Sequence, residues 1–283
     1  MAKELSNRCI LLIVNLFNDL KMSIEQKYKF KILHTINHEL FDRKLESQCT
    51  YEIEIVVYSN SRIEIKRKKF KVNDKKVTSK FENIAHTYND VLFPVLFEIR
   101  GGNFFLANYN EISKRLIHTD KELKLKHEGA GLEYIRAAFF EKAAKDCCAM
   151  VNYMHSFGLI SILRLCLEKP ENNNDYHFSW HVLPLDTEVF WKGRKSFNPE
   201  SNILQYKGES NKDKALFNVV KTAGNNYQYP DKVTDEESVI TATIKHETQY
   251  KTTQFDFTIS ETEIKINNSY FKYRENLILT RKE

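Results

Sequence analysis

Histidine pairs are the first side chains in this sequence whose spacing could do chemistry. His34 and His38 stand four residues apart, as do His177 and His181. On a helix this spacing lets two imidazoles bind one metal ion, whereas on a strand four residues span about 13 Å, too far for one ion. The sequence around both pairs indicates strands or strand ends, and neither pair has a third ligand at a known spacing. We therefore predict no metal site and no cofactor.

Thiols and carboxylates offer two further possibilities for catalysis. Cys147 and Cys148 are adjacent but fall within the longest helical pattern, where nothing lowers a thiol pKa as a helix N-terminus would, so we interpret them as packing residues. The paired glutamates, Glu52 with Glu54 and Glu261 with Glu263, lie on alternating strands and are typical of a solvated face.

Sequence motifs of common enzyme classes are missing. The chain has no phosphate-binding loop, dinucleotide fingerprint, nucleophile elbow or H-E-x-x-H sequence. We therefore predict no catalytic residues and a protein that is not an enzyme.

The segment from Arg62 to Lys80 is strongly basic. It has nine basic and two acidic residues, whereas the whole chain has a formal net charge of +5. Its densest part gives our candidate site for an anionic partner: Lys66, Arg67, Lys68, Lys69 and Lys71. Such clusters attract phosphates, so nucleic-acid binding through this segment is one hypothesis. The alternative is that a lysine-rich strand protects a sheet edge from pairing with another chain.

A helical pattern runs from Gly131 to Glu168, between the segments that carry most of these candidate residues. Apolar side chains recur there every three or four residues, which places them on one face of a helix. Gly158 is expected to split the stretch into two helices, over residues 132–157 and 159–168. We expect both to form the shared core of the protein.

Strand patterns flank this helical segment on both sides. Alternating residues predict strands at 27–32, 49–58 and 62–72, a hairpin at 93–109, and further strands at 176–183 and throughout 237–280. Helices are expected at 77–91 and from Glu111 to about Lys126, the second capped by Asn110. The fold class is therefore α+β, with an N-terminal and a C-terminal antiparallel sheet packed around the central helices. The corresponding regions are 1–128, 129–170 and 171–283.

Composition limits the class of protein. A hydrophobic fraction of 42% with 29% charged residues is typical of a soluble globular chain. Five cysteines without regular spacing indicate a reducing compartment, and hence the cytoplasm. No run of about 18 apolar residues is present, so we expect no membrane span.

The missing catalytic signatures and the many long strands, whose edges can take partners, predict a non-enzymatic binding or assembly protein. It could be a component or adaptor of a larger bacterial complex, with a protein partner or a second copy of itself. A carrier of an apolar small molecule between sheet and helices is the alternative, beside nucleic-acid binding. Five aromatic residues of the C-terminal strands could line such a cavity, although we expect them to form core: Phe255, Phe257, Tyr270, Phe271 and Tyr273.

Overall fold

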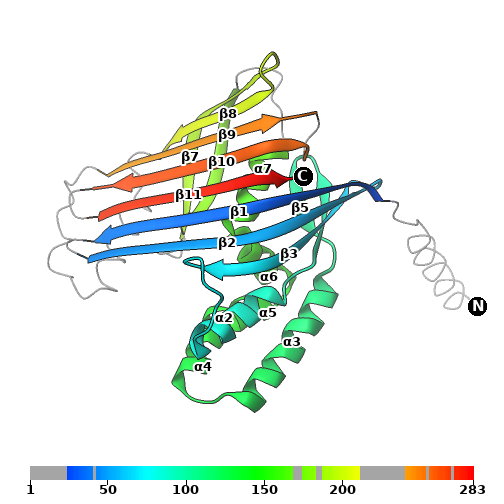
Figure 1. Ribbon diagram of the computed structural model, residues 1–283, viewed down its shortest axis with the longest axis vertical. Coiled ribbons are helices and arrows are strands. Elements are labelled where there is room, and N and C mark those ends of the chain that lie inside the picture. The colour runs from blue at the N-terminus through cyan, green and yellow to red at the C-terminus, as the bar shows by residue number, and fades with distance from the viewer. Residues whose placement is uncertain are drawn as a thin grey trace, which may run out of the picture.

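A single antiparallel sheet of eleven strands dominates the computed structural model (Figure 1). The structure describes residues 24–40, 43–167, 174–182, 187–210, 240–252, 255–268 and 271–283. The strands in chain order are β1 (Ile24–Leu40), β2 (Arg43–Tyr58), β3 (Arg62–Val72), β4 (Val95–Arg100), β5 (Asn103–Leu106), β6 (Asn174–Val182), β7 (Thr187–Asn198), β8 (Ile203–Glu209), β9 (Thr241–Tyr250), β10 (Phe257–Asn267) and β11 (Phe271–Lys282). Their order in the sheet is β5-β4-β3-β2-β1-β11-β10-β9-β8-β7-β6.

The pairing of β1 with β11 joins the two halves of the chain into this one sheet. It runs from Lys29 opposite Lys282 to Leu40 opposite Phe271. An α+β protein built on antiparallel strands is therefore confirmed, but the prediction of two separate sheets is wrong. The physical reason is that strands at opposite ends of a sequence leave no local signal of their pairing, unlike hairpins, whose turns are read directly.

Alternation along each strand gives the sheet one buried and one exposed face. In β1, Tyr28, Phe30 and Ile32 are buried, whereas Lys29 and Lys31 between them are exposed. Because successive side chains point to opposite faces, the lysines belong to a solvated outer face. The aromatic and aliphatic residues belong to the inner face.

Helices pack against the inner face (Figure 1). They are α2 (Lys80–Asp90), α3 (Tyr109–Lys126), α4 (Ala130–Ala138), α5 (Phe140–Ala144), α6 (Cys147–His155) and α7 (Gly158–Leu167). None of the helices in the described ranges is long and apolar enough to cross a membrane.

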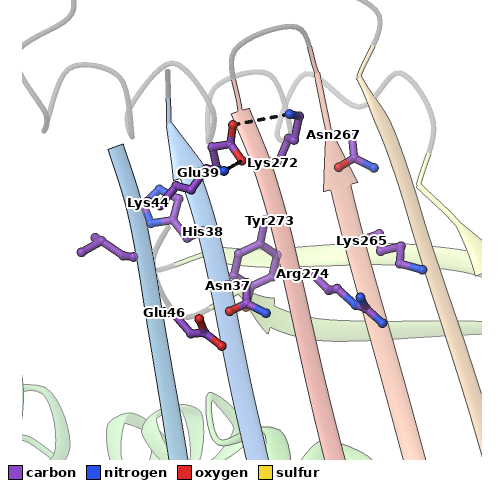
Figure 2. A pocket seen from close by; sticks show the side chains of 11 residues that line it. Asn37, His38, Glu39, Lys44, Glu46, Lys265, Asn267, Lys272, Tyr273 and Arg274 are labelled. Atoms are coloured by element: carbon purple, nitrogen blue, oxygen red, sulfur yellow. Dashed lines mark hydrogen bonds and ion pairs between the residues drawn. The ribbon is translucent and has the colours of Figure 1, made fainter. Parts of the chain in front are cut away.

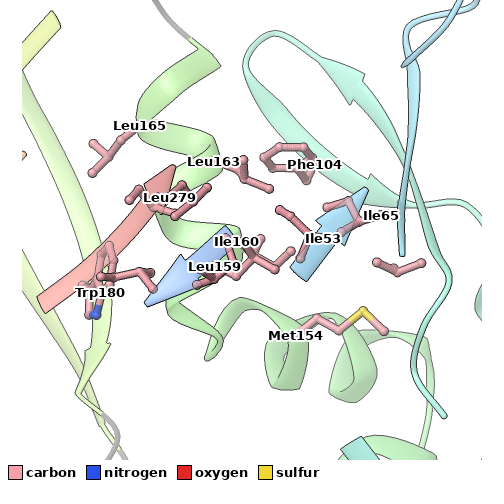
Figure 3. Close-up of a cluster of buried hydrophobic side chains, with 14 of the residues drawn as sticks. Ile53, Ile65, Phe104, Met154, Leu159, Ile160, Leu163, Leu165, Trp180 and Leu279 are labelled. Atoms are coloured by element: carbon pink, nitrogen blue, oxygen red, sulfur yellow. The ribbon is translucent and has the colours of Figure 1, made fainter. Parts of the chain in front are cut away.

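Helix α7 lies at the centre of the core. It contacts β10 and β11 in the middle of the sheet and also β6 at its edge. Three strands lie between β6 and β10, so the sheet must curve around the helix. Figure 3 shows core side chains approaching α7 from several elements, including Ile53 of β2, Phe104 of β5, Trp180 of β6 and Leu279 of β11.

The central helical stretch is more broken than expected. The predicted split at Gly158 is confirmed, but the continuous helix over 132–157 is wrong, because it consists of α4, α5 and α6. Asp146 starts α6 by accepting the amide hydrogen of Ala149 at 2.8 Å, a cap that favours a new helix over continuation of the old one. The Asn110 cap is also wrong: α3 begins at Tyr109, directly after Asn108.

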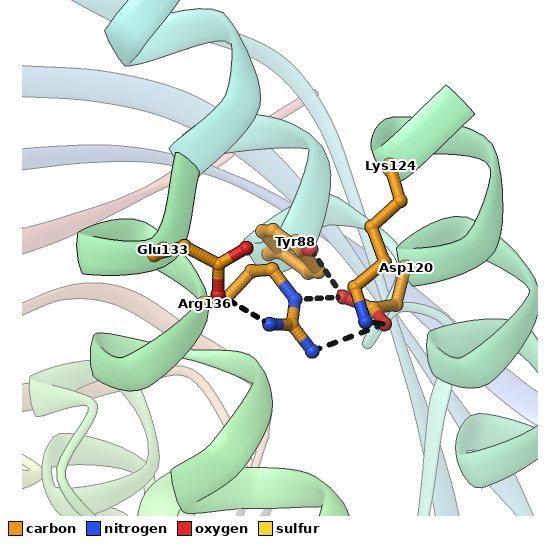
Figure 4. Close-up of polar contacts among 5 residues, drawn as sticks. All are labelled: Tyr88, Asp120, Lys124, Glu133 and Arg136. Carbon is orange, nitrogen blue, oxygen red and sulfur yellow. Dashed lines mark hydrogen bonds and ion pairs between the residues drawn. The ribbon is translucent and has the colours of Figure 1, made fainter. Parts of the chain in front are cut away.

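A buried polar cluster joins three of the helices (Figure 4). Asp120 of α3 accepts hydrogen bonds from Tyr88 of α2 and from Nε of Arg136 of α4, each at 2.7 Å. Burial alone would raise the pKa of Asp120, but the hydrogen bonds from Arg136 and Tyr88 outweigh it and hold that pKa below its ordinary value. The cluster therefore fixes the helical layer in position beside the sheet.

Candidate functional site

Buried polar side chains interrupt the apolar inner face where the sheet curves around α7. They come from β7, β9, β10 and β11, and each is at most 3% exposed: Lys195, His246, Thr248, Ser260, Thr262 and Glu275. Polar groups are rarely placed in a core without hydrogen-bond partners, because burying them unpaired costs free energy. Two groups of hydrogen-bonded side chains, one around Glu275 and one around His246, define the candidate site.

Glu275 of β11 is the centre of the first polar group. Its Oε1 lies 2.7 Å from Nε2 of His34, and its Oε2 accepts hydrogen bonds from Nε1 of Trp180 at 3.1 Å and from the Tyr273 hydroxyl at 2.7 Å. Burial, together with the negative charge of Glu275, raises the pKa of Tyr273 well above its ordinary value. Because Trp180 belongs to β6, this carboxylate ties the edge strand to the middle of the sheet across the curve.

His246 of β9 belongs to the second polar group. Its Nδ1 lies 2.9 Å from the hydroxyl of Thr262, and its Nε2 lies 2.9 Å from the hydroxyl of Thr248. Burial, and secondarily the charge of Lys195, lowers the pKa of His246 to about 3. The imidazole is therefore neutral, with one ring nitrogen donating and the other accepting.

The same polar group hydrogen-bonds α7 through Cys166. The Cys166 Sγ lies 3.3 Å from the Thr248 hydroxyl and 3.2 Å from the Ser260 hydroxyl. The Tyr250 hydroxyl donates to the backbone carbonyl of Cys166. Burial raises the pKa of the Cys166 thiol, so this sulfur serves as a polar contact and not as a nucleophile.

The interior around α7 combines apolar side chains with hydrogen-bonded polar groups. Small-molecule sites are mostly apolar with a few placed polar groups that fix orientation, and this mixture is found around α7. Within the described ranges, no group of three or more histidine, cysteine, aspartate or glutamate residues could hold a metal ion.

The predicted basic site is not brought together as one cluster. Lys66 Nζ lies 3.0 Å from Glu64, and Lys69 Nζ lies 3.2 Å from Glu52. The Arg67 side chain is only 9% exposed, and its guanidinium lies 4.6 Å from the centre of the Phe93 ring. Its Nη2 also approaches Asp90 of α2 at 3.3 Å. Lys68 and Lys71 are exposed, so binding of an anionic partner by these residues stays a prediction.

The edge-protecting alternative for the same segment gains support from the register. Strand β4 pairs with β3 only from Arg62 to Ile65. In the described part of the chain, the remainder of β3 therefore has a strand neighbour on one side, β2. Lys69 adopts a positive φ of 58° beside a register irregularity, and such bulges with charged side chains protect strand edges.

The structure also places the cysteine and glutamate residues that the sequence singled out. Cys147 and Cys148 are exposed at the start of α6, so the packing prediction for them is wrong. Glu263 is on the outer face, where it binds Lys265 at 2.8 Å and Arg274 at 2.6 Å.

The aromatic residues of the C-terminal strands form core, as expected. The buried ones are Phe255, Phe257, Phe271 and Tyr273. Tyr270 lies outside the described residues.

Sequence reasoning missed Glu275 and His246. The sequence did contain a signal for both residues. Each occupies a core-facing position of a strand in which the other core-facing residues are mostly apolar. Glu275 interrupts the series Phe271, Tyr273, Leu277 and Leu279, all buried. A lone ionisable residue at such a position indicates a buried polar contact, although it does not show the partner.

A hollow of about 520 Å³ lies at the ends of β1, β2, β10 and β11 (Figure 2). Its lining is largely charged, and Glu39 lies 3.4 Å from Lys272 and 3.5 Å from Lys44. In these ion pairs, the glutamate and the lysines offset each other's charge at the solvated surface. The hollow therefore offers little to an apolar ligand.

Comparison with known proteins supports the architecture alone. No protein-family model and no curated protein sequence matches the chain. The fold belongs to the class in which one large antiparallel sheet curves against helices, and a solved structure of that kind is similar. That structure, described as lipid-protein interactions in lipovitellin, matches with a TM-score of 0.50 and 9% sequence identity over 93% of this chain and 26% of that chain. The present chain thus spans about a quarter of the length of the lipovitellin chain.

Proposed function

We propose that this protein is a non-enzymatic carrier of an apolar molecule with one polar end, bound against the inner face of the curved sheet in the place that α7 occupies without the ligand. The observation that carries the proposal is the hydrogen bonding of an apolar helix to polar groups embedded in an apolar interior, through Cys166. The likeness to lipovitellin, whose structure is described in terms of lipid-protein interactions, supports it.

Helix α7 occupies the place that the ligand would take. Ile162, Leu163 and Leu165 are fully buried and correspond to the apolar body of the ligand. The carbonyl and thiol of Cys166 correspond to its polar end. When a ligand displaces α7, its polar end would replace the carbonyl and thiol of Cys166 as the hydrogen-bond partner of Tyr250 and of the hydroxyls that contact Cys166. No buried polar group of the sheet would then lose its partner.

A reversible disulfide can test whether α7 must move. Because Cys166 Sγ lies 3.2 Å from the Ser260 hydroxyl, Ser260→Cys places a second thiol beside it and can lock α7 to β10 on oxidation. We expect the oxidised variant to bind a fluorescent long-chain fatty acid at least about tenfold more weakly than its reduced form, a difference of about 1.4 kcal/mol. Mass spectrometry of the intact chain verifies the cross-link.

The matched control is Ser260→Cys combined with Cys166→Ser, which cannot form the lock and should bind equally under both conditions. Equal binding by the oxidised and reduced forms of the single variant would contradict displacement of α7. Absence of saturable fatty-acid binding to the unmodified protein would overturn the carrier proposal itself.

An assembly role is the second proposal, favoured by the two edge strands. Among the described residues, β5 pairs only with β4 and β6 only with β7, so both present backbone groups to which a partner strand could add. Light scattering after size-exclusion chromatography tests it: a complex or oligomer supports this role, and a monomer that captures no partner opposes it. The cytoplasmic location and the lack of enzymatic activity stay predictions from the sequence.

A further inference from the structure

Lysines of β1 and β3 form regular rows with glutamates of β2 across the outer face of the sheet. The register places a glutamate of β2 between a lysine of β1 and a lysine of β3 in each row. The two rows are Lys29–Glu54–Lys66 and Lys31–Glu52–Lys68. Both of these carboxylates are therefore flanked by two ammonium groups, whereas the neighbouring row, Lys27–Val56–Glu64, has one charge of each sign. The three rows together keep an excess of positive charge.

The carboxylates of these rows are recessed beneath the lysines. The Glu52 and Glu54 side chains are 27% and 21% exposed, whereas that of Lys66 in the same row is 37% exposed and those of the adjacent Lys282 and Lys69 are 41% and 68% exposed. Glu52 already binds both Lys69 at 3.2 Å and Lys282 at 2.6 Å. The outermost layer of this face therefore consists mainly of ammonium groups.

Like charges also oppose each other directly on this face. Lys29 of β1 lies opposite Lys282 of β11. Glu52 offsets part of the repulsion between these two lysines, because it binds Lys282 at 2.6 Å.

We propose that this outer face, with Lys27, Lys29 and Lys31 at its centre, docks on an anionic lipid bilayer. The inference rests on the proposed carrier function, since an apolar cargo leaves water for a lipid phase and its carrier must meet that phase to exchange it. The lysines also spread over a broad sheet surface with a strand spacing of about 4.8 Å. Each lysine near an anionic bilayer contributes about fivefold to binding.

Nucleic acid is a less suitable occupant, although the basic and aromatic residues alternate in the sequence. Tyr28 and Phe30, which alternate with these lysines, are 5% and 0% exposed and point into the core. They cannot stack on bases, which is the contact that single-stranded nucleic acid requires beside its phosphates.

Co-sedimentation with vesicles tests the docking surface. The unmodified chain should bind vesicles containing about one third phosphatidylserine in phosphatidylcholine, and should be released by salt. Changing Lys27, Lys29 and Lys31 together to glutamine should weaken this binding by about 100-fold. The matched control carries the same change at Lys192, Lys207 and Lys245, exposed lysines on the outer face of β7, β8 and β9, and should bind nearly as the unmodified chain does.

Equal losses in the two triple variants would overturn the proposal, because they would reflect net charge and not this face. Tighter, salt-sensitive binding to an RNA or DNA fragment than to vesicles, lost with the same three lysines, would also overturn it. Fatty-acid binding in solution is measured in parallel. If the unmodified chain binds no fatty acid, the carrier function is refuted. If it binds fatty acid but no vesicles, only the docking face is refuted.

Discussion

Replacing His246 by glutamine is expected to make the protein less sensitive to acid. Burial lowers the pKa of His246 in the folded chain to about 3, with Lys195 adding to the effect, from an ordinary value of 6.5. The unfolded chain therefore takes up a proton on this residue below about pH 6.5, whereas the folded chain does not. Since the unfolded state binds more protons, the free energy of unfolding falls as the pH falls.

The size of this effect follows from the two pKa values. Between about pH 7.5 and about pH 5, protonation of the unfolded imidazole lowers the free energy of unfolding by about 2 kcal/mol. Glutamine keeps a donor and an acceptor for Thr248 and Thr262 but does not titrate. The loss of stability over this pH range should therefore be about 2 kcal/mol smaller in His246→Gln than in the unmodified chain.

Urea unfolding at the two pH values measures the difference. Trp180 and Trp191 are the two tryptophans of the sequence, and both are buried, so their fluorescence reports the transition. His177→Gln, at an exposed position of β6, is the control and should keep the original pH dependence. Equal losses in the unmodified chain and in His246→Gln, or an imidazole signal of His246 that titrates near its ordinary pKa in NMR spectra, would refute the reasoning.

Three further substitutions probe the elements around this interior. Gly158→Ala should lower the free energy of unfolding by about 1–3 kcal/mol in urea titrations, because the added Cβ would lie 2.9 Å from Cζ2 of Trp180; unchanged stability would show that β6 moves away freely. Asp120→Asn should cost about 3 kcal/mol by the same assay, since it leaves the Arg136 guanidinium without its main counter-charge, and a loss below about 1 kcal/mol would contradict this. Glu275→Gln should speed amide hydrogen exchange in β6, which this carboxylate ties to β11 through Trp180; unaltered exchange there would speak against the tie.

The local elements of the fold could be predicted because their signals are local. The hairpin of β2 and β3 follows from alternating residues on either side of Ser59, Asn60 and Ser61, and its pairing is observed from Tyr58 opposite Arg62 onward. The pairing of β1 with β11 could not be predicted, because nothing in either strand identifies the other. The sequence therefore located most of the strands but not their full lengths, since β1 extends over Ile24–Leu40 where only 27–32 was expected, and it divided the sheet wrongly.

The candidate site was harder to predict for a similar reason. Glu275 stands alone in an apolar strand, and its hydrogen-bond donors come from three strands: His34 from β1, Trp180 from β6 and Tyr273 from β11. The basic segment, by contrast, was visible from composition. Its lysines are partly paired with glutamates of neighbouring strands, a relation that only the register of the sheet reveals.

The pairing of β1 with β11 also limits how much of the sheet can fold while the ribosome is still synthesising the chain. Strands β1 to β5 can form hairpins early, but the second edge of β1 must wait until β11 has been synthesised. Such long-range pairing slows folding, and an open edge meanwhile attracts strands from other chains. Nascent or truncated chains that end before Phe271 should therefore depend on chaperones and aggregate readily when these are scarce.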